Sequence, residues 1–218
     1  MTHFKLMKNL ARLSILGALI MIVGDYLLFL TPWVSGKDFN SINAMRTMSE
    51  PRLMWGGIAG PISALAYAAG SCVFYVALKQ HNKIIAALIS IFSVITYGLV
   101  GAAHCLFAVI GFGGTEYAAG TEAGQIQENV TSMVETMSNM ISVTALLSSV
   151  LLIYMIVRHT TAFPKWILVV MPLTLTLIQP LITPFVPYPL GSIIIGGWPN
   201  WAAVIFFACL LIVWRKRA

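Results

Sequence analysis

Long apolar runs make up most of the chain, and short polar segments separate one run from the next. A helix needs about 20 mostly apolar residues to cross the hydrocarbon core of a bilayer. Six runs meet this requirement, at approximately residues 13–34, 53–78, 84–113, 134–157, 164–187 and 192–214. The pattern therefore predicts an all-α fold, a single polytopic transmembrane domain over residues 1–218 that is built as a bundle of six helices.

The last two runs differ from the others in their proline content. The prolines within or beside them are Pro172, Pro180, Pro184, Pro187, Pro189 and Pro199. A bundle tolerates prolines in its spans because neighbouring helices satisfy the carbonyl groups that proline leaves without a partner. The boundaries of these two spans are therefore the least sharply predicted. Residues 188–198 are expected to form either a re-entrant lid or the first part of the sixth helix.

The composition agrees with a surface that faces lipid. Of the 218 residues, 59% are hydrophobic and 9% are charged, whereas soluble domains carry about 25% charged residues. So few charges cannot cover a water-soluble globule of this length, and the soluble classes are excluded. The three cysteines lie in apolar runs without a CxxC spacing, which favours packing residues over a disulfide framework.

The charged residues define the predicted orientation. Ten of the thirteen basic residues lie on one side: Lys5, Lys8, Arg12, Lys79, Lys83, Arg158, Lys165, Arg215, Lys216 and Arg217. The other side has Lys37, Arg46 and Arg52, together with six of the seven acids: Asp38, Glu50, Glu116, Glu122, Glu128 and Glu135. Because cytoplasmic loops carry an excess of lysine and arginine, the sequence predicts that both termini are cytoplasmic.

The seventh acidic residue, Asp25, lies inside the first predicted span. A carboxylate at the bilayer centre costs about 2.5–3.5 kcal/mol on insertion scales, and it normally faces the bundle interior beside a polar partner. His104 is the one histidine of the sequence that falls inside a predicted span. At 1.5 Å per residue, the two lie roughly 10 and 14 Å below the outer edge. They are expected either to contact each other or to be held by separate packing hydrogen bonds.

Other polar residues gather in the same outer half of the predicted bundle. In the fourth span, one helical face carries Glu128, Ser132, Glu135, Asn139 and Ser142 at spacings of four and three residues. The simplest interpretation is a cavity that opens toward the extracellular side. Its predicted ligand-binding residues are Asp25, Tyr26, His104, Asn139, Gln179, Trp198 and Asn200. The alternative is hydrogen bonding between helices, which is worth about 0.6 kcal/mol per contact.

Metal, cofactor and nucleic-acid chemistry have little support in the sequence. One histidine, one aspartate and Cys105 within the spans are too few for a zinc site, which takes three or more protein ligands. The chain has no P-loop and no GxGxxG motif. We therefore predict no metal, no cofactor and no nucleic-acid partner.

Five short motifs are distributed over nearly the whole chain. They are Gly24-Asp25-Tyr26-Leu27-Leu28, Trp55-Gly56-Gly57-xxx-Gly60-Pro61, Gly101-xx-His104, Phe163-Pro164-Lys165-Trp166 and Gly196-Gly197-Trp198-Pro199-Asn200. In these motifs the chain resembles an uncharacterised family of bacterial membrane proteins with six helices, a Gly-Asp motif in helix 1 and a histidine in helix 3. The resemblance implies six spans in a bacterial cell membrane and singles out Asp25, His104 and Asn200. It implies no activity, and Ala103 stands where an aromatic residue is more usual.

Four functions of different classes fit these observations. The leading hypothesis is an intramembrane pocket that binds a lipid or a small amphiphile, with Asp25 and His104 as its polar floor and Asn200 at its mouth. A second is a membrane-embedded enzyme in which His104 is the general base and Asp25 orients it. A third is a proton-coupled carrier in which Asp25 titrates. A fourth is a structural subunit. The expected partners are membrane lipid and an amphiphilic ligand, and a homo-oligomer is compatible with the sequence.

Overall fold

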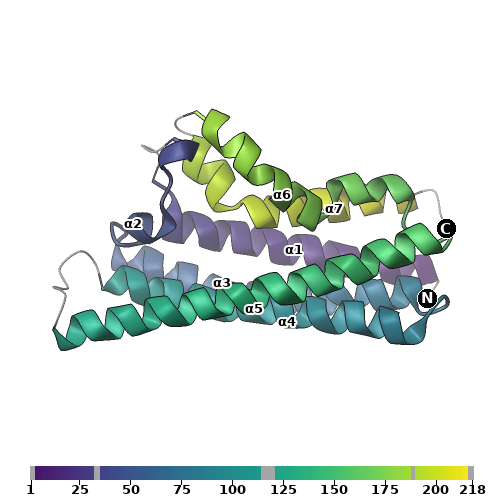
Figure 1. Ribbon diagram of the computed structural model, residues 1–218, viewed down its shortest axis with the longest axis horizontal. Helices are drawn as coiled ribbons and strands as arrows, with labels where there is room; N and C mark the ends of the chain where they lie inside the picture. Colours follow the sequence, from purple (N-terminus) through teal and green to yellow (C-terminus); the bar gives the residue numbers. More distant parts are fainter. Residues whose placement is uncertain (1–2, 32–34, 114–120, 188–189, 216–218) are drawn as a thin grey trace.

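The computed structural model describes residues 3–31, 35–113, 121–187 and 190–215. Every regular element within these residues is helical (Figure 1), which confirms the predicted all-α class. The long helices are α1 (His3–Phe29), α3 (Glu50–Leu78), α4 (Lys83–Phe112) and α5 (Glu122–Arg158). The shorter elements are η1 (Gly36–Asp38), α2 (Ser41–Met45), η2 (Lys165–Val170), α6 (Pro172–Ile182), η3 (Thr183–Phe185), η4 (Gly191–Ile195) and α7 (Trp198–Trp214).

Four helices, α1, α3, α4 and α5, are long enough and apolar enough to cross a membrane. They cover most of the first four predicted spans, although α1 ends at Phe29, before the predicted end at residue 34. Polar caps define where two of the helices begin. The Asn82 side chain accepts hydrogen bonds from the backbone N–H groups of Ile84 and Ile85 at the start of α4, both at 3.0 Å. Thr121 accepts from the backbone N–H of Gly124 at the start of α5. With 37 residues, α5 is about 55 Å long, and it projects past its neighbours (Figure 1).

The last two predicted spans are not continuous helices. Residues 164–187 are divided into η2, the 11-residue α6 and η3. Proline explains the breaks, because it lacks a backbone N–H and disfavours a helical conformation in the residue before it. Thus η2 ends at Val170, and α6 starts at Pro172. The sixth segment consists of a π-helical turn, η4, followed by the 17-residue α7. Residues 188 and 189 of the segment expected to be a lid or the start of the sixth helix lie outside the described residues, and residues 190–197 lead directly into α7.

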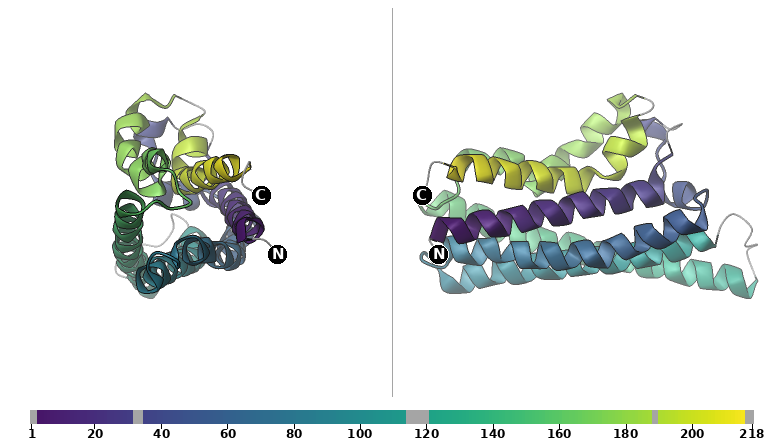
Figure 2. Two further views of the ribbon diagram at one scale, coloured as in Figure 1. Left: turned by 90° about the vertical axis from the view of Figure 1, so that its right-hand side faces the viewer. Right: turned by 180° about the vertical axis from the view of Figure 1, so that it is seen from behind.

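The helices are arranged around a common centre. In the end-on view, α1, α3, α4 and α5 form a curved row that α6 and α7 close (Figure 2, left). Within the row, α3 packs between α1 and α4, and α5 packs on the far side of α4. On the other edge, α7 packs against α1 and α6 packs against α7. By contrast, α5 and α6 touch each other at few positions.

Both chain ends lie at the same end of the bundle (Figure 1). One large buried apolar cluster packs the helices together at this end. It includes Met7 near the start of α1, Leu78 at the end of α3, Ile156 near the end of α5 and Trp214 at the end of α7. The described basic residues of the predicted cytoplasmic side lie at or near these helix ends and the starts of α4 and η2: Lys5, Lys8, Arg12, Lys79, Lys83, Arg158, Lys165 and Arg215. We call this region the basic end.

A second, smaller apolar cluster lies toward the opposite end. It includes Leu28, Phe29, Met45, Leu53 and Ile110, from α1, α2, α3 and α4. Arg52, one of the cations on this side, uses its guanidinium to donate to the carbonyl oxygens of Tyr26 at 2.6 Å and Leu30 at 3.3 Å. Tyr26 is in the last turn of α1 and Leu30 directly follows the helix, and the partial negative charge of a helix C-terminus favours a nearby cation. The position of Arg52 is therefore explained by capping of α1.

Candidate functional site

A hydrogen-bonded polar network lies inside the bundle and joins three helices. The Nε2 atom of His104 on α4 lies 3.3 Å from Oδ1 of Asp25 on α1. The other carboxylate oxygen, Oδ2, accepts a hydrogen bond of 2.8 Å from the side-chain amide of Asn200 on α7. The exposed fractions are 4% for Asp25, 3% for His104 and 8% for Asn200. The structure thus brings together three of the residues predicted for the site. We call them the central network.

A fourth helix extends this network. The Tyr67 hydroxyl on α3 donates to Oδ1 of Asn200 at 3.0 Å, and its side chain is fully buried. The Tyr67 ring stacks on that of Tyr97 from α4, with centroids 3.9 Å apart and planes nearly parallel. Since Tyr67 holds the amide oxygen, the Asn200 amide nitrogen is directed at Asp25. Tyr67 was not among the predicted site residues, because no local sequence pattern connects it to Asn200.

Close helix packing places His104 next to Asp25. A Cβ atom added at Gly60 on α3 would collide with the Cβ of His104 and lie 2.7 Å from the carbonyl oxygen of Gly101. At Gly24, an added Cβ would lie 2.9 Å from the Cβ of Ala59 and 3.4 Å from His104 Nδ1. Glycine at these two positions lets α1, α3 and α4 approach closely, as small residues do in membrane bundles. The network depends on this approach.

The start of α7 is oriented toward the carboxylate. Gly197 precedes α7, and its carbonyl accepts hydrogen bonds from the N–H groups of Asn200 and Trp201, both at 3.1 Å. A Cβ added at Gly197 would lie 3.5 Å from Asp25 Oδ2, so the first turn of α7 is adjacent to Asp25. Helix N-termini carry partial positive charge, which favours a carboxylate by about 0.3–1 kcal/mol. Asp25 is therefore held by side-chain donors and by the α7 dipole together.

Both nitrogen atoms of His104 face acceptors. Nε2 faces Asp25, and Nδ1 lies 3.5 Å from the carbonyl oxygen of Gly56, at the limit of a hydrogen bond. The rings of Phe29 and Phe107 flank the imidazole in edge-on geometry, with centroids 6.4 and 5.9 Å away. The imidazole is thus fixed on its polar edges and surrounded by aromatic carbon elsewhere.

The central network forms part of the wall of a partly open cavity of about 620 Å³ between the helices, which we call the central cavity. Aromatic and aliphatic side chains make up much of its lining, including Phe29, Phe107, Phe206 and Phe207. Its polar lining residues are Asp25, Ser41, Ser93, Thr96, Tyr97, His104, Ser138, Ser142, Ser148, Ser149, Thr176, Gln179 and Asn200. The cavity therefore combines an apolar volume with polar groups from α1, α4, α5, α6 and α7.

A pair of hydroxyl contacts joins α4 and α5 beside this cavity. The hydroxyl oxygens of Ser93 and Ser148 lie 2.8 Å apart, and those of Thr96 and Thr144 are also 2.8 Å apart. These pairs were not predicted, because the polar residues of the outer half gave the stronger pattern in the sequence. The available signal was the spacing of three or four residues between hydroxyl residues on two successive spans.

The four remaining residues predicted for the site do not all line the central cavity. Gln179 lines the central cavity, whereas Tyr26, Asn139 and Trp198 are not among its lining residues. Asn139 is exposed on α5. Its neighbour Ser138 is about 100° away around the helix, and Ser138 and Ser142 are the residues that line the cavity. The Trp198 indole donates to the carbonyl oxygen of Leu175 at 2.9 Å. Trp198 therefore connects the start of α7 to α6.

Replacing Trp198 by phenylalanine tests this connection. Trp198→Phe keeps an aromatic ring but removes the indole N–H, so the Leu175 carbonyl loses its donor. We expect a loss of about 1 kcal/mol of stability, the usual net value of one hydrogen bond, measured as a lower melting temperature in detergent. Trp55→Phe on α3 is the control, because Trp55 is 58% exposed. Equal melting temperatures for Trp198→Phe and the unmodified protein would contradict the assigned role.

Long apolar helices around a buried polar network are typical of integral membrane proteins, and four of the helices here have the length and composition to cross a membrane. The chain belongs to a family of unknown function, DUF6796, whose sequence model matches residues 2–217. No curated protein and no solved structure matches the chain. The match confirms the predicted membership of an uncharacterised family.

Proposed function

We propose that this protein is a polytopic membrane protein that binds a lipid or small amphiphile in the central cavity. The observation that carries the proposal is the position of the central network, in the wall of a largely apolar cavity of about 620 Å³. Ligand pockets commonly have volumes of about 300–1,000 Å³, with mostly apolar linings and a few polar groups that orient the ligand.

The proposed topology has six spans, with both termini in the cytoplasm of a bacterial cell. Its support is the concentration of lysine and arginine at the basic end, since cytoplasmic segments are enriched in both. The fifth span would be the broken segment η2–α6–η3, and irregular backbone is tolerated at membrane depth where it lines a cavity. The sixth would be η4 with α7. Together they cover residues 191–214, roughly 35 Å at the rise of a helix.

The lining favours a head group that donates hydrogen bonds. Asp25 accepts from His104 and Asn200, and a carboxylate has roughly four acceptor positions. Two positions therefore remain for a hydroxyl, amide or amine of the ligand. Gln179 and Thr176 on α6 supply further polar groups on another wall. The aromatic lining would enclose the hydrocarbon part of the same molecule.

The boundary between α5 and α6 provides the proposed route from the bilayer. Both helices line the central cavity, through residues such as Ser142 on α5 and Thr176 on α6. Because α5 and α6 touch at few positions, separating them breaks few contacts. An amphiphile could then move sideways from the membrane and bring its head group to Asp25 without crossing water.

The geometry supports binding more than the other hypotheses. A general base must reach the proton that it removes, but the two nitrogens of His104 already face Asp25 and Gly56. A carrier requires access from both sides, whereas the large apolar cluster fills the basic end of the bundle. A purely structural subunit has no need of a cavity of this size. The enzyme and carrier hypotheses therefore remain secondary.

Filling the cavity tests the proposed function. Ala145 on α5 lines the central cavity, whereas Val143 on the same helix does not and is 57% exposed. We expect Ala145→Trp to reduce co-purified amphiphile by at least about tenfold, which corresponds to 1.4 kcal/mol. Val143→Trp should leave the amount unchanged. Mass spectrometry of extracts from the purified full chain, normalised to protein, gives the measurement.

Two results would contradict binding in the central cavity. One is an Ala145→Trp protein that folds and retains the same amphiphile in the same amount. The other is an equal loss in Ala145→Trp and Val143→Trp, which would assign the retained lipid to the outer surface of α5.

A further inference from the structure

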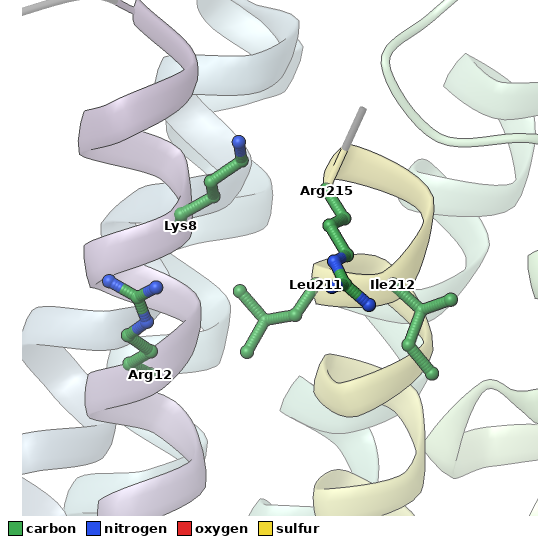
Figure 3. Close-up of a pocket in the computed structure, with 5 residues that line it drawn as sticks. All are labelled: Lys8, Arg12, Leu211, Ile212 and Arg215. Atoms are coloured by element: carbon green, nitrogen blue, oxygen red, sulfur yellow. The ribbon is translucent and has the colours of Figure 1, made fainter. Parts of the chain in front are cut away.

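A second cavity, of about 350 Å³, lies at the basic end between α1 and α7. It is lined by Lys8 and Arg12 of α1 and by Leu211, Ile212 and Arg215 of α7 or its end. Figure 3 shows the two α1 cations standing across from Leu211 and Arg215. We call this site the basic groove. It is separate from the central cavity, because the two share no lining residue.

Local structure brings the three cations together. Lys8 and Arg12 are four residues apart, so they occupy the same face of α1. Arg215 follows the last residue of α7, where Trp214 is fully buried and donates from its indole nitrogen to the carbonyl oxygen of Ala162 at 2.9 Å. Trp214 also belongs to the same apolar cluster as Met7 on α1. The packing of Trp214 therefore fixes the end of α7 beside Lys8 and Arg12.

The positively charged side chains of the groove favour binding of an anion. Among the described residues that line the groove, three are basic and none is acidic. Arg12 is exposed and donates to a neutral partner, the side-chain oxygen of Asn9, at 3.0 Å. Guanidinium groups bind phosphate oxygens in pairs of parallel hydrogen bonds. Two arginines and a lysine around one cavity thus match a phosphate group.

Apolar side chains in the same groove point to a lipid rather than a free anion. Leu211 is half-buried, and Ile212 is 72% exposed on an apolar helix. In a bilayer these two side chains would contact the part of an acyl chain nearest to the head group, on the hydrocarbon side of the cations. Basic pockets between helices at the cytoplasmic side of membrane proteins are known to bind anionic head groups.

We infer that the basic groove binds the phosphate head group of an anionic phospholipid, with the acyl chain beginning against Leu211 and Ile212. Lys8 and Arg12 hold the phosphate from α1, and Arg215 holds it from α7. The lipid would then connect the first and last helices of the bundle. The assignment to the cytoplasmic leaflet rests on the proposed orientation, whereas the binding itself is independent of the central cavity.

The test compares two triple variants of the full chain with the same net charge. One, Lys8→Gln with Arg12→Gln and Arg215→Gln, removes the groove cations. The other, Lys5→Gln with Lys83→Gln and Lys165→Gln, removes exposed cations of the basic end that do not line the groove. Native mass spectrometry measures lipid adducts after mixing with equal amounts of phosphatidylglycerol and phosphatidylcholine. Each cation near a lipid head group contributes about fivefold in affinity, so the groove variant is expected to lose phosphatidylglycerol on the order of 100-fold.

The control variant should keep its preference for phosphatidylglycerol within about threefold, since its substitutions affect only the general field of the surface. An equal loss in both triple variants would overturn the inference in favour of non-specific charge. If inorganic phosphate displaced the lipid at equal concentration, the groove would be an anion site without lipid recognition. Should the groove variant fail to purify, Arg12→Gln alone is expected to lose about fivefold, and no loss relative to Lys5→Gln would overturn the inference.

Discussion

Asp25→Ala is expected to lower the melting temperature in detergent by roughly 10 °C. The substitution leaves His104 Nε2 and the Asn200 amide without their acceptor inside the bundle. Removing one partner of a buried pair costs about 3–5 kcal/mol, and 1 kcal/mol corresponds to roughly 2–4 °C for a chain of this size. The substitution therefore affects the partners from α4 and α7 at once.

Two further variants show whether this loss comes from the network. Asp25→Asn keeps one acceptor oxygen for His104 but presents an amide nitrogen to Asn200, so about 1 kcal/mol should be lost, the value of one hydrogen bond. Asn139→Ala removes an exposed polar side chain on α5 and should change stability by less than about 0.5 kcal/mol. A stable Asp25→Ala protein, equal to Asn139→Ala in melting temperature, would contradict the network.

Gly60→Ala and Gly98→Ala are expected to change stability in opposite directions. At Gly60 the added methyl group meets the Cβ of His104 and the backbone of Gly101, so α3 and α4 must move apart. Overpacking of this kind costs about 1–3 kcal/mol. At Gly98, also within a long helix, an added Cβ meets nothing within 4 Å. There alanine should stabilise the helix by up to about 1 kcal/mol through its higher propensity.

Thermal unfolding of both variants in the same detergent provides the comparison. The displacement of His104 in Gly60→Ala should also weaken its contact with Asp25, so combining Gly60→Ala with His104→Ala should cost less than the sum of the two single effects. Equal and small effects at Gly60 and Gly98 would show that α3 and α4 are not in close contact near His104.

Part of the central network could be predicted from the sequence, because charged residues are rare in membrane spans. Asp25 and His104 stood out since an isolated charged or titratable residue in a span needs a partner, and the structure places them 3.3 Å apart. The first four spans followed from length and apolar content. Asn200 was singled out through its motif, and it proves to be the second partner of Asp25.

Other features depend on tertiary structure that no local pattern encodes. Tyr67 orients Asn200 across 133 positions of sequence, and nothing around Tyr67 indicates such a distant partner. Asn139 belongs to a regular polar stripe, but of Asn139 and Ser142 in that stripe it is Ser142 that lines the central cavity. Ser138, which is outside the stripe, lines the cavity as well. The prolines indicated that the boundaries of the fifth span would be irregular. They did not predict that α6 would be only 11 residues long.

The function rests on one claim, that the central cavity holds an amphiphile beside the central network. An experimental density map of the full chain in lipid nanodiscs tests it most directly. We expect elongated density between α5 and α6, with its polar end within hydrogen-bonding distance of Asp25 or Asn200. An interior in which side chains from α5 and α6 close the cavity, with no density beside Asp25, would contradict the claim.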